Sequence, residues 1–184
     1  MLKSILNFNL LVTTFRNRED DAFNELAELL EIFGDNNPSI KISSVSGVIL
    51  GNTSLDPLHV VKNCKDLVRN EPWKFRYILR IIPLERTCAT EITEIHNIVK
   101  QLCRKISHHE TYKITVEKRH TKLRSDYIIS MVTMDLDMKV NLDEPDWIIL
   151  IQIINKIAGI SIIRPNQIFS SAKEKIYTQQ EDRI

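Results

Sequence analysis

Apolar and polar positions in the first half of the chain switch between strand and helix periods. Strands that are half buried alternate every two residues, whereas amphipathic helices repeat every 3.6 residues. On this basis the chain predicts, in order, a strand, a helix, two short strands, a helix and a strand, over residues 7–15, 20–34, 39–51 (both short strands), 56–70 and 74–85. The order β-α-β-β-α-β is the ferredoxin-like arrangement.

Three local signals place the ends of these elements. Gly34 is a natural C-cap for the first helix. The pair Asp56-Pro57 starts the second helix, because aspartate caps a helix and proline fits its first position. Pro83 must end the last strand or leave it at a sheet edge, because proline has no N–H for the ladder.

The second half of the chain predicts another helix and sheet unit. Residues 90–106 form the strongest helical pattern, with an apolar stripe and acids in the first turn. We expect a strand over 111–117, a buried helix over 125–136 that is apolar on most sides, and two apolar strands joined by a tight turn within 147–163. Ser171 and Glu174 match a capping box, which predicts a short terminal helix.

Composition is that of an ordinary globular protein. The 184 residues are 43% hydrophobic and 27% charged, with a net charge of +1, so no global field indicates a nucleic acid or a membrane. The three cysteines form no CxxC and no zinc-ligand spacing, which favours reduced thiols and a cytoplasmic protein. We expect no transmembrane segment, because the most apolar stretch contains Lys156 and is shorter than the ~20 residues that a spanning helix needs.

The small net charge conceals separate basic and acidic blocks. Residues 62–80 carry a net charge of +4 and residues 104–124 a net charge of +5, whereas residues 16–35 and 135–146 carry −5 and −4. Each block alone is explained by a solvated surface. Two basic blocks that converge in space would instead favour a polyanion.

The densest basic cluster lies where a predicted strand ends and a predicted helix begins. Its members are Lys118, Arg119, His120, Lys122 and Arg124. A helix N-terminus exposes unpaired N–H groups and a partial positive charge. Basic side chains beside that terminus would form a phosphate site, and His120 could stack on a base or bond locally.

Four segments resemble the THUMP domain, an RNA-binding module of several tRNA-modifying proteins. They are "FRYILRIIPLERTCAT", "YKITVEKRH", "SDYIISMVTM" and "KVNLDEPDWIILIQIINKIAGISIIRP". The last is the most specific, with Val-x-Leu, an acidic-Pro-Asp step, two apolar strands around Ala-Gly and a final Arg-Pro. Together with this resemblance, the pattern predicts an α/β (α+β) fold, with a ferredoxin-like unit over 1–74, a THUMP domain with a small mixed sheet over 75–165, and a tail over 166–184 that could form a short helix.

The segment "IIPLERTCAT" resembles in particular the stand-alone THUMP proteins that partner a tRNA cytidine acetyltransferase. That resemblance implies a tRNA-binding adaptor, itself not an enzyme, that is needed to form N4-acetylcytidine. It implies contacts to the tRNA acceptor stem and 3′ end from Lys118, Arg119 and Arg124, with Arg80, Arg86 and Lys122 as further candidates. The roughly twenty residues after the THUMP pattern are too few for a catalytic domain.

No known catalytic or cofactor-binding motif supplies a competing site. The chain has no GxGxxG, P-loop, nucleophile elbow or HExxH, so we expect no cofactor and no metal. His108 and His109 are expected in an exposed loop, and Cys88 is expected to pack rather than react. Trp73 either staples the two units together or offers a stacking face to a base.

Three other functions remain open from the sequence. The chain could bind another structured RNA, such as precursor rRNA, without an acetyltransferase. It could be a protein-interaction scaffold whose basic blocks are only solvated surface, or an enzyme without a familiar motif. Salt-sensitive tRNA binding separates the RNA-binding functions from the scaffold.

Overall fold

The computed structural model describes residues 7–181, which divide into two compact units. The first unit joins Phe8–Pro83 to the segment that starts at Asn166, and the second unit is Leu84–Pro165. These boundaries differ from the predicted 1–74, 75–165 and 166–184. The strand before Pro83 and the C-terminal tail both belong to the first unit, because both pair in its sheet.

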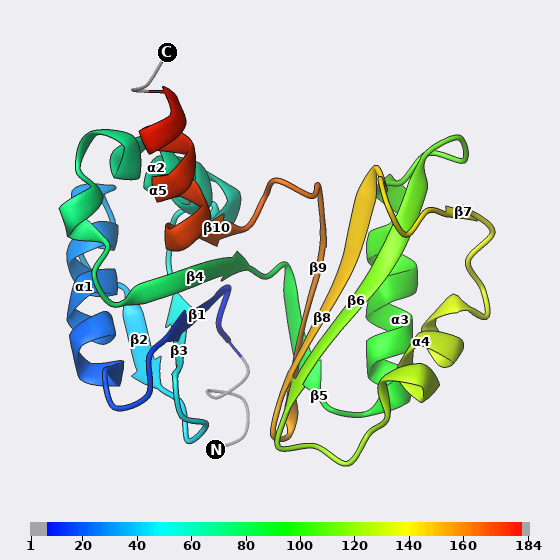
Figure 1. Cartoon of the computed structure of the whole chain (residues 1–184). Coiled ribbons are helices and arrows are strands. Elements are labelled where there is room, and N and C mark those ends of the chain that lie inside the picture. Colours follow the sequence, from blue (N-terminus) through cyan, green and yellow to red (C-terminus); the bar gives the residue numbers. More distant parts are fainter. Residues whose placement is uncertain (1–6, 182–184) are drawn as a thin grey trace. The chain divides into compact units, whose positions relative to one another are not determined.

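The first unit has the predicted ferredoxin-like order (Figure 1). Its elements are β1 (Leu10–Thr14), α1 (Glu19–Ile32), β2 (Ser39–Ile42), β3 (Val48–Asn52), α2 (Pro57–Asn70), the 3-10 helix η1 (Pro72–Lys74) and β4 (Ile78–Pro83). The antiparallel sheet has the strand order β10-β4-β1-β3-β2. Buried side chains of α1 and α2 pack with one face of this sheet in a single hydrophobic core.

The predicted helix signals of the first unit are confirmed. The Asp56 side chain accepts bonds from the N–H groups of Leu58 (2.7 Å) and His59 (3.2 Å), and Pro57 is the first helical residue. Gly34 adopts φ +101° just after α1, a left-handed conformation that glycine adopts without a steric penalty.

The C-terminal segment completes the first unit. Strand β10 (Phe169–Ser170) pairs with β4, and helix α5 (Ser171–Glu181) follows it. The Phe169 ring is fully buried with its centroid 4.8 Å from that of Phe75, and Lys175 Nζ donates to the Phe75 carbonyl at 2.7 Å. Glu174 forms an ion pair with Lys65 (3.0 Å), so its carboxylate ties α5 to α2.

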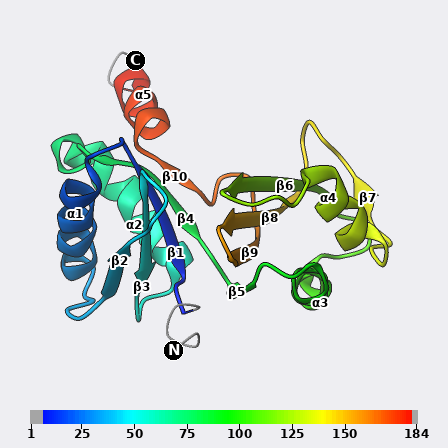
Figure 2. The same cartoon turned by 90° about the horizontal axis from the view of Figure 1, so that it is seen from below.

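The second unit is a mixed sheet with two helices on one face (Figure 2). Its elements are β5 (Arg86–Ala89), α3 (Ile92–Leu102), the 3-10 helix η2 (Cys103–Lys105), β6 (Thr111–Arg119), α4 (Ser125–Thr133), β7 (Lys139–Val140), β8 (Trp147–Ile154) and β9 (Ile157–Ile163). The strand order is β5-β9-β8-β6-β7, in which β6 runs parallel to β7 and β8 and the other pairs are antiparallel. The predicted small mixed sheet is confirmed, while the short strands β5 and β7 were not predicted.

The prediction that helix 125–136 is buried is wrong for half of its surface. Only Ile128 and Val132 of α4 are fully buried, one turn apart on the side that faces the sheet. Tyr127, Ile129 and Met134 are exposed. A helix against one face of a sheet can bury only one stripe, however apolar its other positions are.

Helices of the described part of the chain are all too short or too polar to span a membrane. The three cysteines are buried, as predicted, and unpaired.

A polar cluster fixes the end of the second sheet where β6 begins. The Glu110 carboxylate accepts from the Ser107 N–H (3.0 Å) and from Arg164 Nη2 (2.8 Å), and the Arg164 guanidinium stacks 3.7 Å from the centre of the Trp147 ring. The hydrogen bond from the Ser107 N–H, with further contributions of the Trp147 and Arg164 side chains, lowers the pKa of Glu110 to about 2.

Replacing Phe169 by alanine tests whether the C-terminal segment is part of the first core. We expect Phe169→Ala to lower the free energy of unfolding by about 3–5 kcal/mol, because it removes a buried ring and leaves a cavity. Urea unfolding followed by circular dichroism measures the change. The control Phe15→Ala, at an exposed position, should change it by less than about 0.5 kcal/mol; equal effects would contradict this packing.

The Glu110 cluster predicts a pH-dependent contribution to stability. The pKa of Glu110 is lower in the folded than in the unfolded chain, so the contribution is present above about pH 4.5 and is lost as pH falls toward about 2. Glu110→Gln should therefore lower Tm at pH 6, and the difference from wild type should shrink by pH 2. Glu144→Gln, whose carboxylate is exposed, should show no such pH-dependent difference; a Glu110 difference that is constant with pH would contradict the assignment.

Candidate nucleic-acid interface

The C-terminal ends of strands β5, β6 and β8 lie side by side at one end of the second sheet. The register pairs Ala89 with Ile157, Ile157 with Ile154, and Ile154 with Arg119. Helix α3 follows β5, and helix α4 follows β6 after a short loop. Both helices therefore begin at this end of the sheet. Residues 118–124 and 155–156 together are called the basic rim below.

Backbone hydrogen bonds join the two segments of the basic rim. The Asn155 N–H donates to the Arg119 carbonyl at 3.0 Å. His120 and Asn155 both adopt a left-handed backbone, with φ of +54° at each, and this conformation turns the chain at the end of β6 and between β8 and β9. The predicted meeting of a strand end with a helix start is therefore present in the fold.

The two lysines predicted in this loop differ in their surroundings. Lys118 Nζ donates to the Leu123 carbonyl at 2.6 Å and closes the loop between β6 and α4. Lys122 is exposed and has no ion-pair or hydrogen-bond partner among the described residues. Lys122 can therefore bind an anion without giving up an existing contact.

The two arginines of the rim are already engaged. Arg119 donates to Gln152 Oε1 (3.3 Å) and lies 3.7 Å from Glu117, with 27% of its side chain exposed. Arg124 forms a two-point contact with Asp126 (3.1 and 2.5 Å), which holds the pKa of that carboxyl below its usual range. A phosphate that binds either arginine must compete with a carboxylate or an amide.

Lys156 belongs to the basic rim although the sequence analysis did not propose it. It is exposed in the turn between β8 and β9, and its carbonyl accepts from the Thr90 N–H at 2.9 Å. The turn between two apolar strands was predicted. Its position beside the end of β6 depends on the parallel pairing of β6 with β8, which the local pattern does not reveal.

Neither of the remaining two candidates belongs to the basic rim. Arg86 begins β5, three residues before the rim end of that strand, and donates to the Glu85 carbonyl at 3.0 Å. Arg80 belongs to β4 of the first unit, where it has partners of its own.

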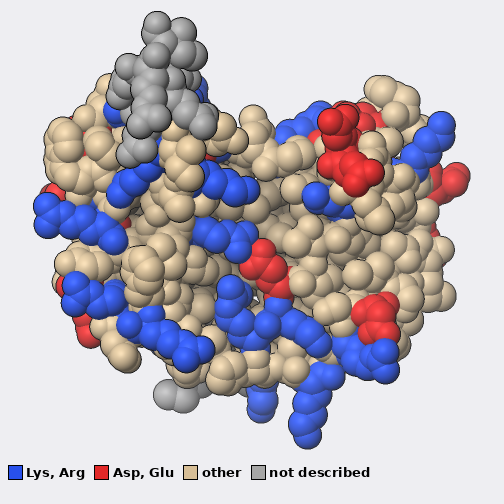
Figure 3. All heavy atoms as spheres, viewed as in Figure 1, with Lys and Arg blue, Asp and Glu red and all other residues tan. Residues whose placement is uncertain are grey.

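The electrostatics of the rim favour an anion. No N-cap side chain bonds the start of α3 or α4, but Glu94 and Asp126 stand in their first turns, and the Asp126 carboxylate accepts backbone N–H groups. The positive end of each helix dipole is therefore partly offset, and the basic side chains are the main source of positive charge here. Figure 3 shows Lys and Arg side chains gathered along the lower edge of the second unit, where the connection from β6 to α4 runs in Figure 1. Phosphate binding by the predicted strand-to-helix cluster stays a prediction.

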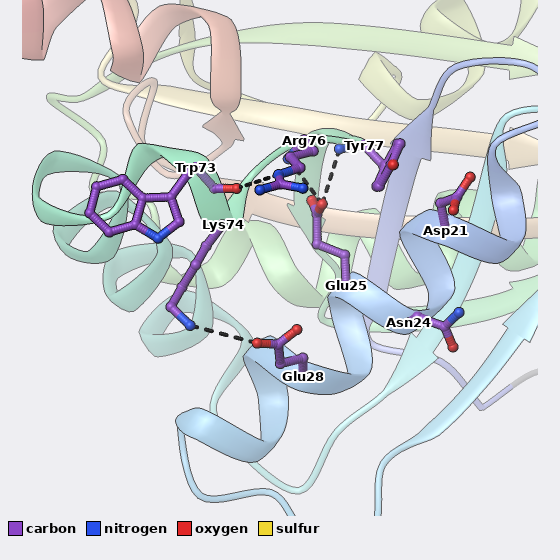
Figure 4. Close-up of a pocket in the computed structure, with 8 residues that line it drawn as sticks. All are labelled: Asp21, Asn24, Glu25, Glu28, Trp73, Lys74, Arg76 and Tyr77. Carbon is purple, nitrogen blue, oxygen red and sulfur yellow. Dashed lines mark hydrogen bonds and ion pairs between the residues drawn. The ribbon is translucent and has the colours of Figure 1, made fainter.

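A pocket on the first unit has a different character (Figure 4). It encloses about 400 Å³ and is lined by Asp21, Asn24, Glu25, Glu28, Trp73, Lys74, Arg76 and Tyr77. The Glu25 carboxylate accepts from the N–H groups of Arg76, Tyr77 and Ile78, all within 3.0 Å, and so holds the start of β4. Its three carboxylates make the pocket a poor site for a polyanion, although the Trp73 ring is 60% exposed.

The cysteines lack the surroundings of a nucleophile. Burial raises the pKa of Cys88 to about 11 and that of Cys103 to about 12, and it raises the pKa of Cys64 further. These thiols are therefore protonated at neutral pH. His108 and His109 lie exposed in a turn, as predicted.

Comparisons with known proteins identify the second unit. Residues 89–163 match the family model of the THUMP domain, so this chain contains a THUMP domain. A search of the curated proteins found no match.

Solved structures share this arrangement of elements. PH1313 from Pyrococcus horikoshii Ot3 aligns with a TM-score of 0.61 at 17% identity, over 85% of this chain and 55% of that one. TrmN from Thermus thermophilus aligns with a TM-score of 0.59 at 12% identity, over 85% of this chain and 46% of that one. This chain therefore spans about half the length of these proteins, and at these identities the likeness shows the fold alone.

The Lys118 contact predicts a structural role that Lys122 does not share. Lys118→Met should speed amide hydrogen exchange across residues 120–124, because the loop loses a charge-assisted bond worth about 0.5–1.5 kcal/mol locally. Lys122→Met should leave exchange there unchanged. Equal exchange in the two variants would contradict the assigned role of Lys118.

Proposed function

We propose that this protein is a tRNA-binding adaptor that presents tRNA to a separate acetyltransferase for N4-acetylcytidine formation. In this proposal the basic rim binds the tRNA near its acceptor stem and 3′ end. The adaptor contributes binding energy and orientation, which raise the effective concentration of tRNA beside the enzyme. The acetyl transfer itself belongs to the partner.

One observation carries the RNA-binding part of this proposal. The basic cluster of a THUMP domain lies at an edge where two helix N-termini meet exposed lysines. Phosphates supply most of the binding energy of such surfaces, and helix N-termini bind phosphate oxygens directly. Lys122 and Lys156 are the rim cations that need break no contact within the described residues.

The adaptor part rests on the resemblance of residues 81–90 to the stand-alone THUMP proteins. The described cysteines are buried thiols with raised pKa values, which suits a protein that binds rather than reacts. Both units supply surfaces, and an enzyme partner supplies the chemistry.

Reversing two rim charges tests the RNA-binding surface. We expect Lys122→Glu with Lys156→Glu to weaken tRNA binding at least tenfold in a fluorescence anisotropy titration. The slope of log K against log salt should become shallower by roughly 1.4–1.8, because two phosphate contacts are lost.

A matched double variant removes the same charge elsewhere. The double variant Lys41→Glu with Lys173→Glu replaces two exposed lysines of the first unit. It lowers the net charge of the protein by four, as the rim variant does. It should lower the affinity by less than about threefold. If both double variants weaken binding equally, tRNA senses only net charge and the rim is not its site.

A reconstituted reaction tests the adaptor role. Purified acetyltransferase from the same organism, acetyl-CoA, ATP and tRNA should yield more N4-acetylcytidine with the wild-type protein than without it, measured by mass spectrometry of nucleosides. The rim variant should lose most of this gain. Formation of N4-acetylcytidine by this protein alone would show that it is an enzyme, and an unchanged yield would show that it is not the adaptor.

A further inference from the structure

The chain between α4 and β8 exposes apolar side chains that the RNA-binding rim does not use. Met134, Val140 and Leu142 are 72%, 58% and 71% exposed. Ten large hydrophobic residues are exposed among the described residues, and these three fall within the eleven residues 134–144. Scattered exposed hydrophobic residues are ordinary, whereas several in one short segment make that segment a candidate interaction surface. Residues 134–144 are called the edge segment below.

The edge segment also presents carboxylates without partners. Asp137, Asp143 and Glu144 are exposed and have no side-chain hydrogen bond or ion pair among the described residues. By contrast, Asp135 pairs with Lys100 (2.7 Å), and Asp146 accepts from Thr111 (2.7 and 2.8 Å). The three unpaired carboxylates outnumber Lys139, the one base in the segment.

The backbone of the second half of the edge segment, from Lys139 to Glu144, is held by hydrogen bonds. Asn141 donates from its amide to the Glu144 carbonyl (2.8 Å), and its Oδ1 accepts from the N–H groups of Asp143 and Glu144. The Asn141 N–H donates to the Tyr112 carbonyl at 3.0 Å, and β7 pairs with the start of β6. A surface that is already ordered loses little conformational entropy when a partner binds.

The edge segment and the basic rim lie at opposite ends of β6. Strand β7 pairs with Thr111 and Tyr112, whereas the rim begins at Lys118 and Arg119. The eight steps from Thr111 to Arg119 span roughly 26 Å at the rise of a β-strand. RNA at the rim and a protein at the edge segment can therefore be bound together, and the carboxylates disfavour RNA at the second place.

We infer that the edge segment is the docking surface for the partner enzyme, through an apolar contact face bordered by lysine and arginine. Charge complementarity identifies this chemistry: apolar side chains supply the buried centre and the unpaired carboxylates select a basic border. The identity of the partner rests on the proposed function. The position of the surface rests on the exposed side chains and the fixed turn at Asn141.

Binding of the purified acetyltransferase, without RNA, tests this surface by biolayer interferometry at low and high salt. We expect Asp143→Lys with Glu144→Lys, and separately Leu142→Ser, to weaken binding at least tenfold. The control Glu31→Lys with Asp66→Lys reverses two exposed acids of the first unit and should stay within twofold. None of these variants should bind tRNA more weakly than wild type, which also shows that each is folded.

The outcomes separate this inference from the proposed function. If the acetyltransferase binds wild type and the edge variants equally, the docking surface is wrong while the adaptor role stands. The inference is also overturned if the wild type raises the yield of N4-acetylcytidine without binding the enzyme. If it neither binds the enzyme nor raises the yield, the inference and the proposed function both fail.

Discussion

The parallel pairing of β6 with β8 is the constraint on which the functional surfaces depend. Tyr112–Arg119 pair residue by residue with Trp147–Ile154. This register brings the Asn155–Lys156 turn against the end of β6 and sets the basic rim at one end of the strand. The same strand carries β7 at its other end. A slip of one residue would turn the buried face of β6 outward, so the register is held by the core.

Long periodic segments could be predicted from the sequence, whereas short strands could not. Helices α1, α2 and α3 carry sustained apolar stripes, and caps such as Asp56 and Gly34 mark their ends. Strand β10 has two residues and pairs with β4, more than eighty residues earlier in the chain. No local period reveals such a pairing, and for this reason the C-terminal segment was predicted as a separate tail.

The part of the candidate site that depends on local sequence could be predicted, whereas the part that depends on long-range strand pairing could not. The run from Lys118 to Arg124 is contiguous, so its position at a strand end and helix start follows from local pattern. The local pattern does not show which of these charged side chains lack a partner. In the structure Arg119 bonds to Gln152 and Arg124 to Asp126. Lys156 joins the rim through the register of the sheet. The burial of α4 was overestimated because its apolar residues surround the helix while the sheet covers only one side.

A basic surface at one end of β6 and an acidic, apolar surface at the other end suit the proposed protein that joins two partners. In the proposed function the cations of the rim bind phosphates, and the apolar side chains and carboxylates of the edge segment bind a protein. Under this proposal, the carboxylates of the edge segment would repel RNA from the end of β6 that is proposed to bind the enzyme. A net charge of +1 conceals this polarity, which is already present along the sequence as a basic block at 104–124 and an acidic block at 135–146.

Hydrogen–deuterium exchange of the protein with and without saturating tRNA tests the central claim most directly. The account predicts slower exchange at residues 118–126 and 155–156 in the complex, with residues 134–144 unchanged. Protection confined to the basic block at 62–80, with exchange at the rim unaltered, would contradict it.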